Sequence, residues 1–90
     1  MARKEKVTRV IDGDTFTTGS TKNPVRLANV NAPERGSRGA AAATHALSDL
    51  VLGQTVSVDT VARDKYGRSV AKVQVDNRSV NAAMRRKGHK

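Results

Sequence analysis

The sequence predicts an α+β fold that is mainly β, with five strands and two helices. Three observations support this prediction: short segments in which apolar and polar residues alternate, one alanine-rich stretch with apolar residues at helical spacing, and turn residues between these segments. A chain of 90 residues has room for one hydrophobic core. We therefore expect residues 1–90 to form a single domain of modest stability.

Three strands are expected before the first helix. A β-branched stretch predicts the first strand at Val7–Ile11, and β character resumes at Thr15–Thr18 after the turn signal Asp12-Gly13. A polar loop then leads to a third strand, Pro24–Val30. A loop at 31–38 separates these strands from the rest of the chain.

Two helices and two more strands follow. The first helix is predicted at 39–52, where four apolar residues recur at helical spacing and Gly53 then ends the helix. Alternating apolar residues predict strands at 56–59 and 71–75, and a short second helix begins near Ser79. Three strands, a helix, two strands and a helix, in that order, are typical of a five-stranded OB-fold barrel.

The charge balance indicates a polyanionic partner. The chain carries 17 basic and 8 acidic residues, for a net charge of +9. Such a balance favours nucleic acid, because lysines and arginines that contact phosphates release condensed counterions. A basic protein without any chemistry, similar to a ribosomal protein, is the alternative that charge alone leaves open.

Other features of the composition narrow the class of protein. The chain has no cysteine, which excludes a disulfide framework and a thiolate zinc site. No apolar run approaches the length of a membrane span, and no apolar segment of a signal peptide follows the basic first residues. We expect no membrane partner, and the localisation stays open.

Three segments combine charged residues with turn residues: RVIDGDTF at 9–16, VRLANVNAPE at 25–34 and DKYGR at 64–68. In the first, Asp12 and Asp14 flank a glycine, which on its own could be a simple turn. An EF-hand loop is excluded because its required glycine and closing glutamate are missing. Among other charged residues, the segments supply the carboxylates Asp12 and Asp14 and the arginines Arg26 and Arg68. Those groups can hold a divalent cation against a phosphodiester and stabilise developing negative charge.

These segments resemble the motifs of the staphylococcal nuclease (thermonuclease) family. That family shows a V-I-D-G-D-T turn, an R-L-x-x-V/I-D-A/T-P-E strand and loop, and a D-x-Y-G-R turn. Val80-Asn81 resembles the start of a family helix and Gly88 the glycine that follows it, so the resemblance runs from about residue 7 to 88. It implies an OB-fold barrel and a hydrolase that cleaves phosphodiester bonds in DNA and RNA with the aid of calcium.

The resemblance also implies a metal site. Asp14 would be a direct calcium ligand, Asp12 would lie beside the metal, and the carbonyl of Ala32 would be a further ligand. The sequence departs from the family pattern at Asn31, where the family has an aspartate that binds calcium. An amide oxygen can coordinate a hard cation but carries no charge, so we expect weaker calcium affinity, by about an order of magnitude or more.

The remaining roles implied by the resemblance concern the substrate. Arg26 and Arg68 would hold the scissile phosphate and stabilise the charge that develops on it. Glu34 would orient or deprotonate the attacking water. Lys65 and Tyr66 would line the nucleotide pocket.

Two alternative functions remain open. One is a non-catalytic OB-fold module that binds single strands, although such modules stack bases on aromatic residues and this chain has only Phe16 and Tyr66. The other is an interaction module, which Asn31 favours and the retained arginines oppose. We expect a monomer that acts on DNA and RNA, preferably single-stranded, with little sequence specificity. His45 is expected on the protein surface rather than in a metal site.

Overall fold

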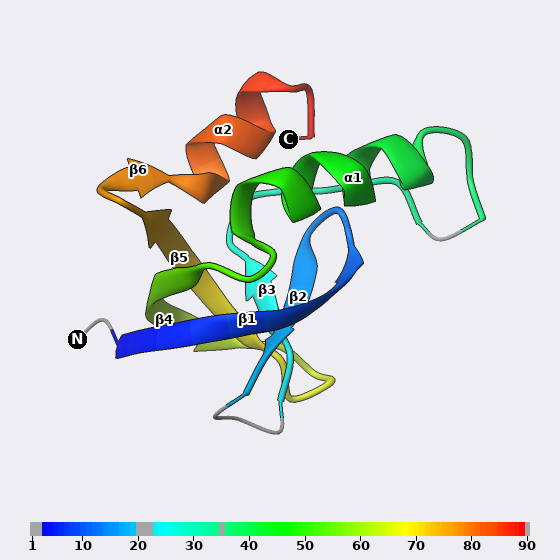
Figure 1. Ribbon diagram of the computed structural model, residues 1–90. Helices are drawn as coiled ribbons and strands as arrows, with labels where there is room; N and C mark the ends of the chain where they lie inside the picture. The colour runs from blue at the N-terminus through cyan, green and yellow to red at the C-terminus, as the bar shows by residue number, and fades with distance from the viewer. Residues whose placement is uncertain (1–2, 20–22, 35, 90) are drawn as a thin grey trace.

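The computed structural model describes residues 3–19, 23–34 and 36–89, and Figure 1 shows its ribbon. In chain order, the elements are β1 Arg3–Asp12, β2 Thr15–Thr18, β3 Val25–Leu27, α1 Ala40–Val51, β4 Thr55–Arg63, β5 Ser69–Val75, β6 Arg78–Ser79 and α2 Val80–Arg86. The predicted order of strands and helices is present, with β6 as an additional short strand between β5 and α2.

Strands β1 to β5 form a closed barrel (Figure 1). The strand order in the sheet is β3-β2-β1-β4-β5-β6, and β3 also pairs with β5 in parallel. This pairing sets Val25 opposite Ser69 and Arg26 opposite Val70. It joins the two sides of the sheet, so the barrel strands have a neighbour on each side. The prediction of a mainly β, five-stranded OB-fold barrel with two helices is confirmed.

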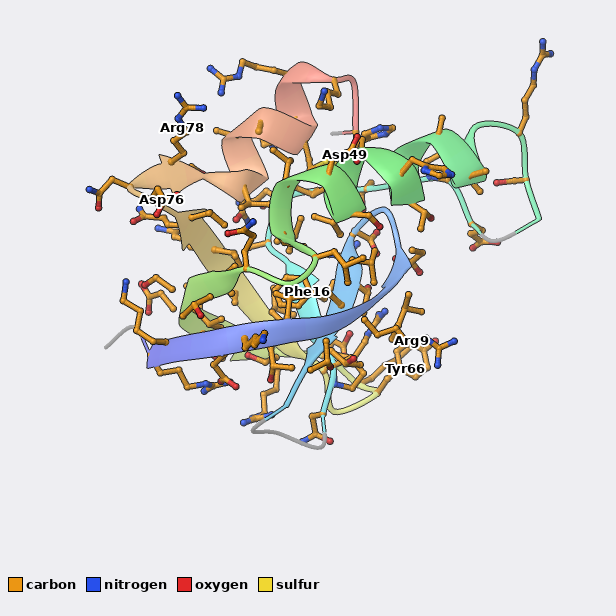
Figure 2. All side chains as sticks on the ribbon, in the orientation of Figure 1. Arg9, Phe16, Asp49, Tyr66, Asp76 and Arg78 are labelled. Atoms are coloured by element: carbon orange, nitrogen blue, oxygen red, sulfur yellow. The ribbon has the colours of Figure 1, made fainter. Side chains whose placement is uncertain are left out.

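The hydrophobic core fills the barrel and continues beneath the helices. Alternation along each strand turns every second side chain inward. Phe16 is fully buried, and Figure 2 shows it inside the barrel. Helix α1 adds Leu47 and Val51 to the same core, and α2 adds Val80 and Met84.

The two helices cover the barrel side by side. Helix α1 has 12 residues and packs against β1, whereas α2 has 7 residues and packs against β5. Helix α1 begins after Gly39, whose φ of 84° is a left-handed conformation that glycine adopts readily. Within residues 3–19, 23–34 and 36–89, no helix is long and apolar enough to cross a membrane.

The first strand is longer than predicted. It begins at Arg3 rather than Val7, because residues 3–6 pair with residues 55–58 of β4; within this extension Glu5 lies inward, with 3% of its surface exposed. The Glu5 carboxylate accepts a hydrogen bond of 2.7 Å from the Thr18 hydroxyl. A charged residue in an inward position breaks the apolar alternation from which strands are predicted, so the sequence pattern missed this extension.

The third strand is shorter than predicted. It ends at Leu27, because Asn29 adopts a left-handed conformation with φ of 60°. The chain turns away there, although the Ala28 N–H still donates to the Ala71 carbonyl at 2.8 Å. The segment that follows, which was predicted as strand, instead carries Asn31 toward the Asp12–Asp14 turn.

Candidate functional site

The turn between β1 and β2 holds two carboxylates in fixed positions. The Asp14 N–H donates to Oδ1 of Asp12 at 3.1 Å, which closes the turn around Gly13. A Cβ atom at Gly13 would lie 2.6 Å from the Cβ atoms of both Ala32 and Ala43. Glycine is therefore required here because α1 and the loop after β3 press against the turn. This close packing brings the residue 32 backbone up to Asp14.

The Asp14 carboxylate is bonded to three separate segments. Only 8% of Asp14 is exposed. Its Oδ1 accepts from the Thr15 hydroxyl at 2.8 Å, and its Oδ2 accepts from the Ala32 N–H at 3.2 Å and from Arg26 Nη2 at 3.4 Å. The turn, β3 and the loop after β3 thus meet at one carboxylate.

Arg26 connects that carboxylate to Asn31. The same Nη2 that contacts Asp14 donates to Oδ1 of Asn31 at 3.1 Å, and Nη1 donates to the Leu27 carbonyl at 3.1 Å. Two oxygens predicted to bind a metal therefore share one guanidinium nitrogen. We name the residues Asp14, Arg26, Asn31 and Ala32 the barrel-end cluster.

The oxygens of the barrel-end cluster, together with those of the neighbouring Asp12, are of the types that bind a hard cation. Asp12 and Asp14 supply carboxylates, Asn31 an amide oxygen and Ala32 a backbone carbonyl, which are the ligand types that calcium prefers. Among residues 3–19, 23–34 and 36–89, no three His, Cys, Asp or Glu side chains gather as a metal site. The candidate ligand set thus holds one carboxylate, that of Asp14, completed by neutral oxygens, with the Asp12 carboxylate beside it.

The pKa values of the two aspartates are shifted in opposite directions. Burial raises the pKa of Asp12, and the hydrogen bond with Asp14 and its negative charge raise it further. Burial also acts to raise the pKa of Asp14, but hydrogen bonds from Asp12, Thr15 and the Ala32 N–H, together with the Arg26 charge, outweigh burial and lower it. Asp14 is therefore the more acidic of the two and the stronger candidate ligand.

The turn between β4 and β5 holds the second arginine. Oδ1 of Asp64 accepts from the Tyr66 and Arg68 N–H groups, both at 2.9 Å, and Oδ2 accepts from Arg68 Nε at 2.6 Å. The Asp64 N–H donates to the Arg68 carbonyl at 3.1 Å. Burial opposes ionisation of Asp64, but the Arg68 and Tyr66 hydrogen bonds and the Arg68 charge lower its pKa. One carboxylate thus organises the whole turn.

Tyr66 presents an exposed ring at this turn. The residue is 70% exposed, and Figure 2 shows it at the outer edge of the barrel. Lys65 Nζ lies 5.1 Å and Arg68 Cζ 5.3 Å from the ring centroid. Cation–π contact keeps both cations near the ring. We name the residues Asp64 to Arg68 the hairpin cluster.

The parallel pairing of β3 with β5 joins the two clusters. Arg26 lies opposite Val70 of β5, and Arg68 directly precedes β5, two residues before Val70. Because side chains alternate along a strand, Arg68 and Val70 share the outer face onto which Arg26 also points. The buried neighbours Val25 and Ser69 face the barrel interior. Both arginines therefore lie on the same outer face of the barrel, one on each side of the β3–β5 pairing, which we call the seam.

Glu34 stands apart from both clusters. It lies in the loop before α1 with an exposed side chain, and its backbone carbonyl accepts from the Ser37 N–H at 2.9 Å. None of the hydrogen bonds or ion pairs found for the described part of the chain joins its carboxylate to Arg26 or Arg68. His45 is exposed on α1, as predicted.

Asp64 is not among the site residues predicted from the sequence, although it is the first residue of the DKYGR motif. The missed signal is an aspartate four residues before an arginine, with Tyr-Gly between them. That spacing lets one carboxylate accept from the backbone and side chain of the arginine across a tight turn.

Comparisons with known proteins identify the family. A family model described as staphylococcal nuclease homologue matches residues 24–89. An uncharacterized endonuclease of Escherichia coli O157:H7 is 38% identical over 86 residues, which cover 92% of this chain and 56% of that protein. The protein ParB of Escherichia coli is 37% identical over 94 residues, covering 92% of this chain and 53% of the relative. The micrococcal nuclease of Shigella flexneri is 37% identical over 70 residues, covering 76% of this chain and 40% of that protein.

The chain spans about half the length of the curated relatives it matches. The family match begins after the Asp12–Asp14 turn and includes β3, Asn31, the hairpin cluster, β5 and both helices, so it contains both strands of the β3–β5 pairing that joins the two clusters. The chain belongs to the staphylococcal nuclease homologue family.

Proposed function

We propose that this chain is a calcium-dependent nuclease that hydrolyses phosphodiester bonds in DNA and RNA with little sequence specificity. The observation that carries the proposal is the arrangement of two arginines on one face of the barrel, on either side of the β3–β5 seam, with one of them bonded to candidate calcium ligands. Relatives named endonuclease and micrococcal nuclease support the same reaction class.

Calcium would be held by Asp14, the amide oxygen of Asn31 and the carbonyl of Ala32, with Asp12 beside it. When bound, calcium would polarise a phosphate oxygen and offset negative charge in the transition state. The lowered pKa of Asp14 keeps this carboxylate ionised at neutral pH and available as a ligand.

Arg26 would exchange partners when the site is loaded. Its Nη2 now donates to Asp14 and Asn31, the oxygens that calcium would take. With those oxygens committed to the metal, the Arg26 guanidinium would be free to turn to the scissile phosphate. The side chain is 21% exposed, so it has access to substrate from this position.

Arg68 would contact the same phosphate from the other side of the seam. Asp64 fixes Nε of Arg68 at 2.6 Å, which leaves the two terminal nitrogens of the guanidinium for phosphate oxygens. Stabilisation of charge by prepositioned donors is commonly the largest part of such catalysis. Asp64 therefore acts as a positioning residue.

Glu34 would accept a proton from the attacking water. The water oxygen would bond to phosphorus while its proton passes to the carboxylate, and the ester P–O bond would break with its electron pair on the leaving oxygen, which takes a proton from solvent. The Glu34 loop follows directly from the Ala32 backbone, which anchors it to Asp14.

Lys65 and Tyr66 would receive the nucleotide beside the cleaved bond. An exposed tyrosine ring offers a stacking surface that any base can use, and a lysine contacts phosphate without reading sequence. Unpaired bases expose their faces, so single strands are the favoured substrate.

A non-catalytic nucleic-acid-binding module is the second candidate. Asn31 favours it, because replacing a carboxylate with an amide removes one negative charge from the metal site. This candidate predicts that nucleic acid binds but is not cleaved at millimolar calcium.

The deciding experiment measures degradation of single-stranded DNA with calcium, with a calcium chelator, and with Arg26→Ala in calcium. We expect cleavage with calcium, none with chelator, and at least a hundredfold lower rate for the variant. Arg78→Ala is the matched control, since Figure 2 shows Arg78 at the end of the molecule opposite Tyr66. Tight binding of DNA without cleavage in calcium would reject the enzyme in favour of the binding module.

A further inference from the structure

A groove of about 790 Å³ runs between α2 and β5, outside both clusters. Its charged lining side chains are Lys72 from β5 and Arg85 and Arg86 from α2. No aspartate or glutamate is among the described residues that line it. Its β5 residues, Lys72, Val73 and Gln74, belong to the end of the strand that leads into β6 and α2 (Figure 1).

The outer face of β5 leads from the hairpin cluster to this groove. Ser69, Ala71 and Val73 are buried, so alternation puts Val70, Lys72 and Gln74 on the outer face that begins at Arg68. At about 3.3 Å per residue, Lys72 lies ~13 Å along the strand from Arg68. An extended nucleic acid strand held by Arg68 can therefore reach the groove along a single β-strand.

The walls of the groove are already fixed in place. Arg85 Nη1 donates to the Asn29 carbonyl at 2.7 Å, which ties α2 to the segment after β3. The buried Asn81 side chain accepts from the Val73 N–H at 2.8 Å and donates to the Ala28 carbonyl at 2.9 Å. A preformed groove loses less conformational entropy when a ligand binds.

A second groove beside α2 gives a useful contrast. It measures about 890 Å³, but Asp49 and Asp76 line it together with Arg78 and Arg86. Figure 2 shows Asp49, Asp76 and Arg78 on that side of the molecule. Its mixed charge gives a polyanion little net attraction. Near the first groove, the acidic residue in register with Lys72 is Asp59 on β4, which does not line the groove.

We propose that the groove between α2 and β5 binds the phosphodiester backbone of the substrate strand at nucleotides beyond the cleaved bond. The occupant is a single nucleic acid strand, recognised through its phosphates by Lys72, Arg85 and Arg86. The inference rests on the proposed function, because it assigns to the groove the same strand that the two clusters would hold.

The test compares binding of a 12-nucleotide thymidine oligomer and a dinucleotide by fluorescence anisotropy, in chelator so that no cleavage occurs. The test variant is Lys72→Gln with Arg86→Gln, two exposed side chains. The matched control is Lys4→Gln with Lys6→Gln on β1, which removes the same charge from exposed positions outside the groove. Circular dichroism melting checks that each variant is folded.

The groove variant should bind the 12-mer about fivefold to tenfold more weakly, while the control changes affinity less than twofold. Loss of two phosphate contacts should make the slope of log affinity against log salt less negative by ~1.4. Dinucleotide affinity should be the same for all three proteins, because a dinucleotide at Arg68 does not reach the groove.

Equal losses in the groove and control variants would overturn the inference, as would a groove effect that persists with the dinucleotide. These results differ from failure of the proposed function. A parent protein that never cleaves DNA, yet loses 12-mer affinity in the groove variant, would keep the groove and reject the nuclease. A parent protein that cleaves DNA, while the groove variant binds the 12-mer as tightly as the parent, would keep the nuclease and reject the groove.

Discussion

The two arginine-bearing clusters of this protein are built in different ways. The hairpin cluster is local: one aspartate and one arginine, four residues apart, bond across a turn. The barrel-end cluster is assembled from the β1–β2 turn, β3 and the loop after β3. Arg68 therefore has a partner with no part in metal binding, whereas Arg26 shares its partners with the proposed cation. On the proposed mechanism, Arg68 would stay held by its partner, whereas Arg26 would be released from its partners when the cation binds.

Replacing each arginine with alanine should separate these two roles. Both Arg26→Ala and Arg68→Ala should slow cleavage at least a hundredfold, because each removes charge stabilisation at the phosphate. Calcium affinity should respond differently. Arg26→Ala removes a cation that lies 3.1 and 3.4 Å from two ligand oxygens, so calcium should bind about threefold to tenfold more tightly. Arg68→Ala should leave it unchanged.

Isothermal titration calorimetry with calcium measures that difference. A weaker or unchanged calcium affinity in Arg26→Ala would show that Asp14 and Asn31 do not both bind the ion.

Gly13→Ala should break the barrel-end cluster alone. The added methyl would lie 2.6 Å from two alanine Cβ atoms, one on α1 and one in the loop after β3. Overpacking of this kind costs about 1–3 kcal/mol. Thermal melting should show a fall of ~4–8 °C for each kcal/mol, and calcium should bind more weakly. Gly19→Ala is the control, because its Cβ would meet Thr8 Cγ2 at an ordinary 3.5 Å. Equal melting temperatures for the two variants would contradict the packing argument.

Asn31→Asp should strengthen the barrel-end cluster. A third carboxylate beside Asp12 and Asp14 adds negative charge to the ligand set, and calcium affinity should rise about tenfold. Asn31→Ala is the opposite control and should lower it. Calorimetry that finds the parent and Asn31→Asp equal would place residue 31 outside the metal site.

Asp64→Asn should weaken the hairpin cluster, with the smallest effect on cleavage among the variants of the two clusters. Arg68 loses its charged partner, so cleavage at saturating substrate should fall about tenfold while calcium affinity stays the same. Because the folded pKa of Asp64 is lowered from 3.8, its stabilising effect is present above that pH. The effect is lost as the pH falls through the lower folded value.

Melting curves of the parent and Asp64→Asn should therefore differ at neutral pH and converge in acid. A difference that persists below the folded pKa would mean that the ion pair is not the cause.

The fold could be predicted from the sequence because alternation and helical spacing identify each element whose core residues are apolar. The hairpin cluster could also be predicted, because its five residues are consecutive in the sequence. The barrel-end cluster was only partly predictable. Asp14 and Arg26 stand out by residue type, but their meeting with Asn31 depends on the left-handed conformation of Asn29. No local pattern marks that conformation, and for the same reason the predicted third strand was too long.

The parallel pairing of β3 with β5 has a kinetic consequence. It unites segments far apart in the chain through a short register that includes Val25 with Ser69, and such long-range contacts are expected late in folding. The two arginines lie on either side of this seam, so a chain whose barrel is still open has no complete site. A ligand that spans the seam binds the closed form and thereby raises its population. Nucleic acid should accordingly slow the opening of the barrel and protect the β3–β5 amides from hydrogen exchange.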